Sequence, residues 1–305
     1  MKPVRWIGVD WGTTNLRAFA MDANGHLIEE KSSDRGMAKL QPHAFESALL
    51  DLIAPWLSRD TEIPVYACGM VGAKQGWREA RYCKVPCPPV AADGLTYAPT
   101  QDKRIRVHIL PGLSQSAPAD VLRGEETQIS GLLAHIPDYS GAVCLPGTHS
   151  KWVSVADGKV ERFTTYLTGE LFDILSGHTI LRHSVGGDEW DNQAFLSAAR
   201  RAVREPQCVA EELFGLRADS LLNGEAPRKL RARLSGMLIG QEIGLSKRYW
   251  SSQNVTLIGS SATVPFYQQV LQDQGCKVEI IDAKDASLAG LALVASILFG
   301  SVCRA

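Results

Sequence analysis

The sequence predicts an α/β protein that contains two related halves. A buried-strand pattern ends at the loop Gly12-Thr13, and a second such pattern ends at Gly147-Thr148. A shift of 135 positions superimposes these loops and also places Asp22 on Asp157. A unit of strand, loop, strand, turn and strand therefore occurs twice, which indicates an internal duplication. With 305 residues the chain is long enough to form two hydrophobic cores.

The first half is predicted to contain four strands and a helix, followed by a less regular part. The strands are expected at residues 4–10, 16–21, from 26 onward and at 63–68. Pro42 is expected to open an amphipathic helix, because proline in a first turn gives up no needed N–H group. The stretch 86–118 is rich in proline and glycine and is predicted to be a loop, and a helix is expected at 120–133.

The second half repeats the strand scheme and adds a helical region. Strands are expected at residues 142–145, 151–155, from 159 onward, 255–258 and 277–281. Helices are expected at residues 169–175, over most of 188–249, at 264–271 and, as an alanine-rich closing element, at 286–298. We therefore expect two domains, formed by residues 1–135 and 136–305.

The composition argues against several classes of function. The net charge of −1 gives no general attraction to nucleic acid or to an anionic membrane surface. No apolar run reaches membrane-spanning length, and the first residues do not resemble a signal peptide. The seven cysteines are scattered, which favours a reducing cytoplasm, and Cys83 and Cys87 are interpreted as free thiols. One basic cluster has helical spacing and is interpreted as a solvated helix face: Arg228, Lys229, Arg231 and Arg233.

Each Gly-Thr loop has the composition of a phosphate-binding loop. Glycine lets the backbone approach a phosphate closely, and successive N–H groups with a threonine hydroxyl can surround its oxygens. One such loop could be an ordinary hairpin turn, whereas two at matched places suggest a clamp with one loop from each half. The sequence has neither the dinucleotide-binding pattern G-x-G-x-x-G after its first strand nor a P-loop.

Two further positions near predicted strand ends could contribute to a nucleotide site. Asp10 precedes the first loop, and a carboxylate beside a polyphosphate suggests an intervening Mg²⁺ held through water. The alternative is an aspartate that caps the turn. Gly259 and Ser260 lie at a strand-to-helix junction, which suits a nucleotide at a helix N-terminus, or a plain turn with a serine N-cap.

Several segments resemble known families. Residues 7–17, 145–152 and 259–261 resemble the first phosphate, second phosphate and adenosine segments of the superfamily of sugar kinases, heat-shock protein 70 and actin. The chain more closely resembles the 2-dehydro-3-deoxygalactonokinases. The matching stretches are residues 69–77, 110–113, 123–128, 146–152 and 167–172, and the similarity extends from about Trp6 to the closing helix.

The resemblance implies a fold, a reaction and a set of nucleotide contacts. The implied fold consists of duplicated ribonuclease-H-like (actin-like ATPase) domains that close on a central cleft. The implied reaction transfers the γ-phosphate of ATP to the 6-hydroxyl of 2-dehydro-3-deoxy-D-galactonate, with Mg²⁺, in cytoplasmic galactonate breakdown. The residues that it places at the nucleotide are Gly12, Thr13, Thr14, Gly147, Thr148, His149, Gly259 and Ser260.

Substrate contacts are expected from polar residues that follow a strand end. A keto-acid carboxylate needs a cation, which Lys74 or Arg78 could supply, with Gln75 and Trp77 beside them. Glu170 could accept hydrogen bonds from sugar hydroxyls. The alternative for each of these residues is a solvated loop.

A general base is expected near the start of the helix predicted at residues 120–133. Glu126 is similar in placement to the aspartate of the Asn-Asp-Thr segment in hexokinases, and Glu125 is the second candidate. The alternative is that both glutamates only complement the helix dipole.

Other functions remain open at this point. One is an actin-like sensor ATPase that controls partner binding, and others are a sugar-sensing repressor and a kinase for another sugar or keto acid. The sequence does not give the oligomeric state, with a homodimer as one option.

Overall fold

Two sheets with the same strand order form the centre of the fold. The computed structural model describes residues 3–59, 61–90, 94–252 and 254–302, and it divides into two units. The first unit consists of Met1–Tyr139, Ala156–Arg162 and Ala283–Ala305, and the second of Ser140–Val155 and Phe163–Asp282.

The first sheet has the order β3-β2-β1-β4-β7-β6. Its strands are β1 (Trp6–Trp11), β2 (Leu16–Met21), β3 (Leu27–Ser33), β4 (Ile63–Gly69), β6 (Thr96–Tyr97) and β7 (Ile105–Ile109). The first three strands are antiparallel neighbours, whereas β4 runs parallel to β1 and β7 runs parallel to β4. A separate small sheet contains β5 (Tyr82–Lys84), β8 (Gly112–Ser116) and β9 (Ala119–Leu122).

The second sheet repeats this arrangement with the order β12-β11-β10-β13-β14. Its strands are β10 (Gly141–Leu145), β11 (Ser150–Ala156), β12 (Lys159–Tyr166), β13 (Val255–Gly259) and β14 (Val278–Asp282). β11 is antiparallel to β10, whereas β13 and β14 follow in parallel. Strand for strand this matches β3-β2-β1-β4-β7, so the predicted α/β fold with duplicated ribonuclease-H-like domains is confirmed.

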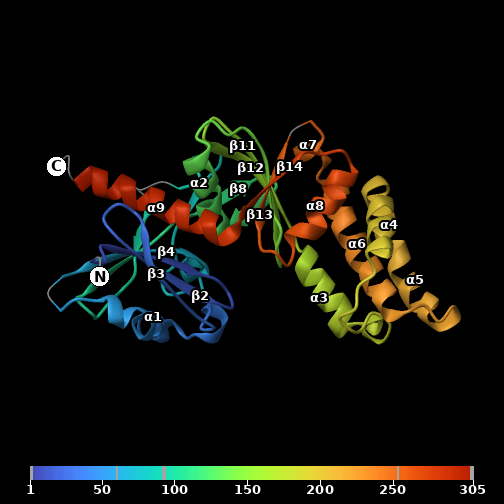
Figure 1. Ribbon diagram of the computed structural model, residues 1–305, viewed down its shortest axis with the longest axis horizontal. Coiled ribbons are helices and arrows are strands. Elements are labelled where there is room, and N and C mark those ends of the chain that lie inside the picture. Colours follow the sequence, from blue (N-terminus) through green and yellow to red (C-terminus); the bar gives the residue numbers. More distant parts are fainter. Residues whose placement is uncertain (1–2, 60, 91–93, 253, 303–305) are drawn as a thin grey trace. The chain divides into compact units, whose positions relative to one another are not determined.

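Helices cover both faces of the first sheet (Figure 1). Ile7, Val9 and Trp11 of β1 pack on one face with α1 (Phe45–Ile53). A 3-10 turn that begins at Pro42 leads into this helix. Trp6 lies on the opposite face with α9 (Ala283–Val302). This alternation is the period of two that a strand buried on both sides requires. The third helix of the unit is α2 (Glu125–His135), which packs against α9.

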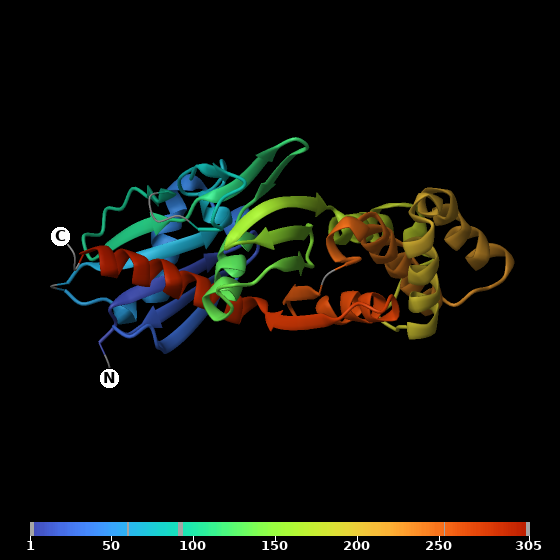
Figure 2. The same ribbon diagram turned by 90° about the horizontal axis from the view of Figure 1, so that it is seen from above.

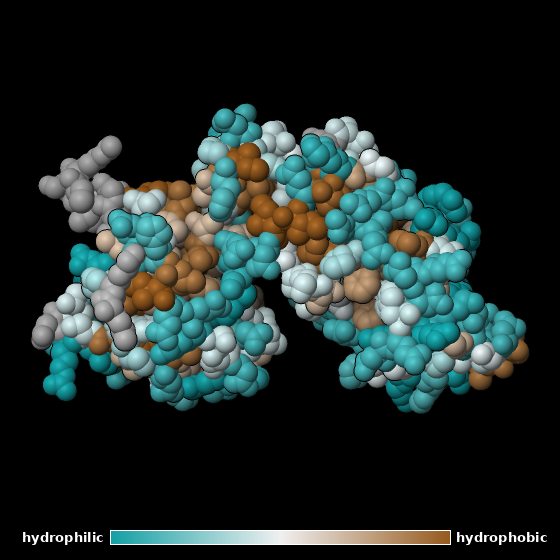
Figure 3. Space-filling model, in the orientation of Figure 1, coloured by the Kyte–Doolittle hydropathy of each residue, from teal (hydrophilic) through white to brown (hydrophobic). Residues whose placement is uncertain are grey.

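Helices also dominate the second unit (Figure 2). They are α3 (Thr168–His178), α4 (Asn192–Arg204), α5 (Val209–Leu222), α6 (Pro227–Leu245), α7 (Lys247–Trp250) and α8 (Val264–Asp273). α4 and α5 both pack against α6, and the visible surface over these three helices is largely hydrophilic in Figure 3. Three members of the predicted basic cluster form ion pairs there: Arg228 with Glu189, Lys229 with Glu225, and Arg233 with Asp219.

The structure corrects three expectations about the chain. The predicted loop over residues 86–118 contains β6, β7 and β8. Ile105, Val107 and Ile109 of β7 alternate into the core despite the surrounding prolines and glycines. The helix expected from residue 120 begins at Glu125, because β9 takes up the residues before it. The closing helix, expected in the second domain, belongs to the first unit.

Within the described ranges, no helix is both long enough and apolar enough to cross a membrane. Among the described residues, no cysteine forms a disulfide, and this includes Cys83 and Cys87.

Glycine allows α2 and α9 to approach at the level of their backbones. A Cβ atom at Gly131 of α2 would collide with the carbonyl oxygen of Ala286, and one at Gly290 of α9 would collide with that of Thr127. Larger residues at these two positions would force the helices apart.

We predict that Gly131→Ala lowers the free energy of unfolding by about 1–3 kcal/mol, the usual cost of overpacking a core. Urea denaturation measures it. The matched control is Gly215→Ala in the middle of α5, where a Cβ would meet no other atom within 4 Å. The control should gain roughly 0.5–1 kcal/mol from helix propensity. Equal stability changes in the two variants would contradict close packing at Gly131.

Candidate active site

The first loop is held from one side by the chain that follows β3. The carbonyl groups of Gly12, Thr13 and Thr14 accept hydrogen bonds from the backbone N–H groups of Met37, Ala38 and Gly36, respectively. The side chains of Thr13 and Thr14 are exposed. The loop therefore has a fixed backbone and an open polar surface, which suits an anionic ligand.

The second loop is held by the start of α3. The N–H group of Glu170 donates to the carbonyl oxygen of Thr148 at 3.0 Å. A Cβ atom at Gly169 would lie 2.5 Å from the carbonyl oxygen of Gly147, so only glycine allows this contact. Thr148 and His149 are exposed at the tip of the loop. The two loops thus have the same strand context but different supports.

The carboxylates of Asp10, Glu125 and Glu126 lie where β1, β4 and α2 meet in the first unit. Gly69 ends β4 with φ of 91°, and a Cβ atom there would lie 2.6 Å from the carbonyl oxygen of Trp11. Gly124, at the N-cap of α2, lies against Gly69. This crowding brings Glu125 and Glu126, in the first turn of α2, toward the end of β1.

The surroundings of Glu126 make it a weaker acid than usual. Burial raises the pKa of Glu126 to about 7, and the charge of Glu125 adds to this effect. Its carboxylate accepts hydrogen bonds from the N–H group of Gly124 at 2.6 Å and from the hydroxyl of Thr127 at 3.3 Å. Glu125 accepts one from the N–H group of Arg123 at 3.0 Å. Both glutamates therefore accept hydrogen bonds from N–H groups just before the helix, and Glu126 also has a pKa suited to accepting a proton near neutral pH.

Asp10 already has a cationic partner. Its Oδ2 atom accepts a hydrogen bond from Arg17 at 2.8 Å, and Ser287 of α9 also bonds to the carboxylate. Burial raises the pKa of Asp10 above its ordinary value, although Arg17 opposes this. No group of three or more metal-ligating side chains occurs in the part of the chain that the structure describes. A single carboxylate fits Mg²⁺, which usually keeps waters and phosphate oxygens as its other ligands.

The residues expected at the sugar acid lie in two different environments. Lys74, Gln75 and Arg78 are exposed, and Lys74 and Arg78 line a hollow of about 720 Å³ that Arg81 also lines. Trp77 lines the same hollow, but it is only 7% exposed and packs against Trp11 and Phe45, so most of its ring belongs to the core.

Glu170, the other expected substrate contact, is paired with a residue of the second loop. Its carboxylate lies 2.7 Å from Nε2 of His149. The sequence analysis placed these two side chains at the sugar acid and at the phosphate, and the structure brings them together.

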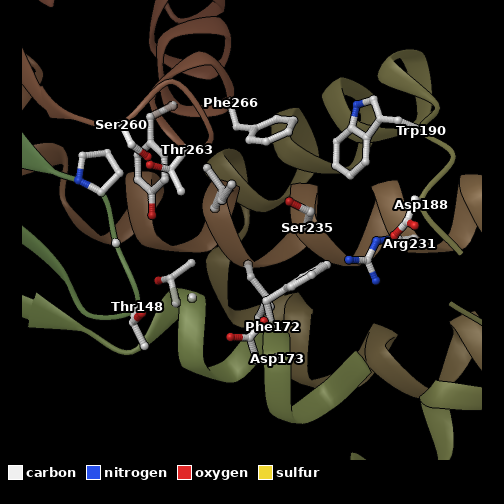
Figure 4. A pocket seen from close by; sticks show the side chains of 17 residues that line it. Thr148, Phe172, Asp173, Asp188, Trp190, Arg231, Ser235, Ser260, Thr263 and Phe266 are labelled. Carbon is white, nitrogen blue, oxygen red and sulfur yellow. The ribbon is translucent and has the colours of Figure 1, made fainter. Parts of the chain in front are cut away.

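A cavity of about 640 Å³ lies in the second unit beside the second loop (Figure 4). Its size is in the usual range for a small-molecule site. Aromatic rings form much of its wall, and Trp190 and Phe266 have centroids 4.9 Å apart. The polar and charged residues that line it include Thr148, Asp173, Asp188, Arg231, Ser235, Ser260 and Thr263. This combination suits a ligand with a flat apolar part and several hydrogen-bonding groups.

Several of these residues were not predicted from the sequence. Arg231 was grouped with the solvated basic cluster, but it lies over the ring of Phe172 at 4.9 Å and lines the cavity. A signal was present, since Arg231, Ser235 and Ile239 share one face of a helix. Ser260 lines the cavity as expected, whereas Gly259 is buried at the end of β13, where a Cβ atom would lie 2.8 Å from Val264.

Comparison with known proteins identifies the family of the chain. The family model described as 2-keto-3-deoxy-galactonokinase matches residues 10–294. A Rhizobium meliloti (strain 1021) protein named probable 2-dehydro-3-deoxygalactonokinase is 41% identical over 95% of this chain and 96% of its own length. The Escherichia coli (strain K12) 2-dehydro-3-deoxygalactonokinase is 33% identical over 95% of this chain and 97% of its own.

Solved structures give the same result for the fold. The crystal structure of a proposed 2-dehydro-3-deoxygalactonokinase from Sinorhizobium meliloti matches with a TM-score of 0.90 and 39% identity, over 96% of this chain and 99% of that one. An activator of 2-hydroxyisocaproyl-CoA dehydratase from Clostridium difficile has a TM-score of 0.51 at 12% identity, over 98% and 97% of the two chains, and shows the fold alone. The chain belongs to the 2-keto-3-deoxy-galactonokinase family, whose members are sugar-acid kinases.

Proposed function

We propose that this protein transfers the γ-phosphate of ATP to the 6-hydroxyl of 2-dehydro-3-deoxy-D-galactonate, as a cytoplasmic step of galactonate breakdown. The observation that carries the proposal is that a carboxylate with a pKa of about 7, Glu126, lies with Asp10 beside a loop suited to phosphate. A hydroxyl that attacks phosphorus must lose its proton, and this carboxylate can accept it.

The nucleotide is proposed to bind in the cavity of the second unit. The base would lie among Phe172, Trp190 and Phe266, with Ser260 and Arg231 available for hydrogen bonds. The phosphates would extend toward Thr148 and His149 of the second loop, with Gly147 allowing a close approach. Thr13 and Thr14, next to Gly12 in the first loop, are proposed as further phosphate contacts. Gly259 would act indirectly, by supporting Ser260.

Asp10 is proposed to hold Mg²⁺ through water. When bound, the metal ion neutralises charge on the β- and γ-phosphates. Arg17 donates to Oδ2 of the carboxylate, and the remaining lone pairs of the two oxygens are suited to accept from a metal-bound water.

The sugar-acid carboxylate is proposed to bind at the hollow that contains Lys74 and Arg78. Arg123 connects this hollow to the proposed general base. Its guanidinium donates to the carbonyl oxygen of Ala80 at 2.8 Å and to the hydroxyl of Tyr82 at 3.1 Å. Arg123 itself lies three residues before Glu126. Gln75 and Glu170 remain proposed contacts for the sugar hydroxyls.

The substrate class is tested by measuring ADP release with a panel of neutral sugars, aldonates and 2-keto-3-deoxy acids. We expect turnover with the 2-keto-3-deoxy acids and the highest kcat/KM with 2-dehydro-3-deoxy-D-galactonate, because Lys74, Arg78 and Arg81 line the hollow proposed to bind the carboxylate. Faster turnover of any neutral hexose than of every keto acid would contradict the proposal.

The general base is tested with Glu126→Gln, which keeps the shape and hydrogen bonding of the side chain but removes its basicity. We expect kcat to fall by about 10²–10⁴-fold, the usual contribution of a general base. Glu125→Gln is the matched control and should retain most of the activity, because its carboxylate has the simpler capping role.

The pH profile separates a base from a helix cap. A base must be deprotonated to act, so kcat/KM of the wild type should rise with pH and level off above the pKa of Glu126, which is about 7. This rise should disappear in Glu126→Gln while ADP binding and thermal stability persist. Full activity in both glutamine variants would mean that α2 does not carry the base.

A further inference from the structure

Glu242 of α6 is a buried carboxylate that the proposed reaction does not use. Its side chain is 2% exposed. Burying a carboxylate is unfavourable unless hydrogen bonds replace the water that it loses. The groups that donate these hydrogen bonds therefore determine which role Glu242 has in the structure.

Hydrogen bonds reach Glu242 from three other elements. Oε1 accepts one from Nε1 of Trp152 at 2.8 Å, and Oε2 accepts one from the hydroxyl of Tyr267 at 2.7 Å. The side chains of Thr168 and Ser150 also bond to the carboxylate. Ser150 and Tyr267 in turn bond to each other at 2.9 Å. All of these side chains are buried.

Three of these partners lie in or next to the proposed nucleotide site, whereas Trp152 belongs to the core. Ser150 directly follows His149 at the end of the second loop, and Thr168 begins α3, which supports that loop through Gly169. Thr168 and Tyr267 both line the cavity. One carboxylate therefore connects the second loop, the start of α3 and the inner face of α8.

A carboxylate at this place determines the direction of the hydrogen bonds as well as the positions of the side chains that donate them. Trp152 can only donate a hydrogen bond, and Glu242 accepts from it on one oxygen and from Tyr267 on the other. An apolar side chain could fill the same volume, but it would leave these donors without an acceptor in a buried place.

We propose that Glu242 is a positioning residue, which holds the second loop and two walls of the cavity in the arrangement that binds nucleotide. The inference rests on the proposed nucleotide site. It assigns to Glu242 no contact with ATP.

Glu242→Gln is the variant that tests this role. The amide has nearly the same volume, but its nitrogen donates where the carboxylate accepted. If the amide oxygen stays at Trp152, the nitrogen faces Tyr267, whose hydroxyl must then turn toward Ser150. The fold can accommodate this reversed hydrogen bond, but the wall of the cavity beside the second loop is changed.

The experiment measures ADP binding by titration calorimetry for the full-length wild type, Glu242→Gln and the control Glu225→Gln. The control makes the same change just before α6, at a surface ion pair with Lys229. We expect Glu242→Gln to weaken ADP binding by about tenfold, as for the loss of one hydrogen bond to a charged group. Its KM for ATP should rise with little change in the KM for the sugar acid, and Glu225→Gln should match the wild type.

The outcomes separate this inference from the nucleotide site itself. A wild type that fails to bind ADP overturns the nucleotide site and the role of Glu242 together. ADP binding that is equally strong in wild type and Glu242→Gln overturns the role of Glu242 alone, as does an equal rise in both KM values. If Glu242→Gln does not fold, Ser150→Ala decides: it removes one hydroxyl of the network with little change in volume, and unchanged ADP affinity overturns the inference.

Discussion

The contact of Gly69 with the carbonyl group of Trp11 is the constraint on which the first unit depends. β4 runs parallel to β1, and at Gly69 the backbones are too close for any Cβ atom. Gly124 packs against the same place, so α2 begins where β1 ends. Carboxylates that crowd at such a point lose water and repel one another, which raises the pKa of Asp10 and of Glu126. The chemistry proposed for the site follows from this backbone contact.

The duplicated fold is used differently in its two units. The first has Asp10 before its loop, whereas Leu145 occupies the matched position in the second. Between its third and fourth strands the first unit has the single helix α1, and the second unit has α3 to α7 at the same point. α3 and α6 supply walls of the cavity and α6 supplies Glu242. One unit thus provides acidic groups suited to proton transfer and a metal ion, and the other provides a cavity with aromatic walls.

Local pattern was sufficient for the strands and loops of the duplicated unit but not for the strands between its two copies or for much of the site. The duplicated unit could be predicted because apolar strands and Gly-Thr loops are signals within a few residues of one another. β7 was missed because the prolines and glycines around it hid its short alternation. Trp77 was expected at the substrate, and nothing local indicates that its ring packs on Phe45. The roles of Arg231 and Glu242 depend on which face of a helix meets a cavity or a buried hydrogen-bond donor. Only tertiary packing decides which face that is.

The most direct test of the central claim is ³¹P NMR of ATP incubated with the protein, Mg²⁺ and 2-dehydro-3-deoxy-D-galactonate. The account predicts that the γ-phosphate signal is replaced by a phosphomonoester signal coupled to the two protons at C6, with ADP formed in equal amount and only when the sugar acid is present. Release of inorganic phosphate that does not depend on the sugar acid would contradict it, because the protein would then be an ATPase and not a sugar-acid kinase.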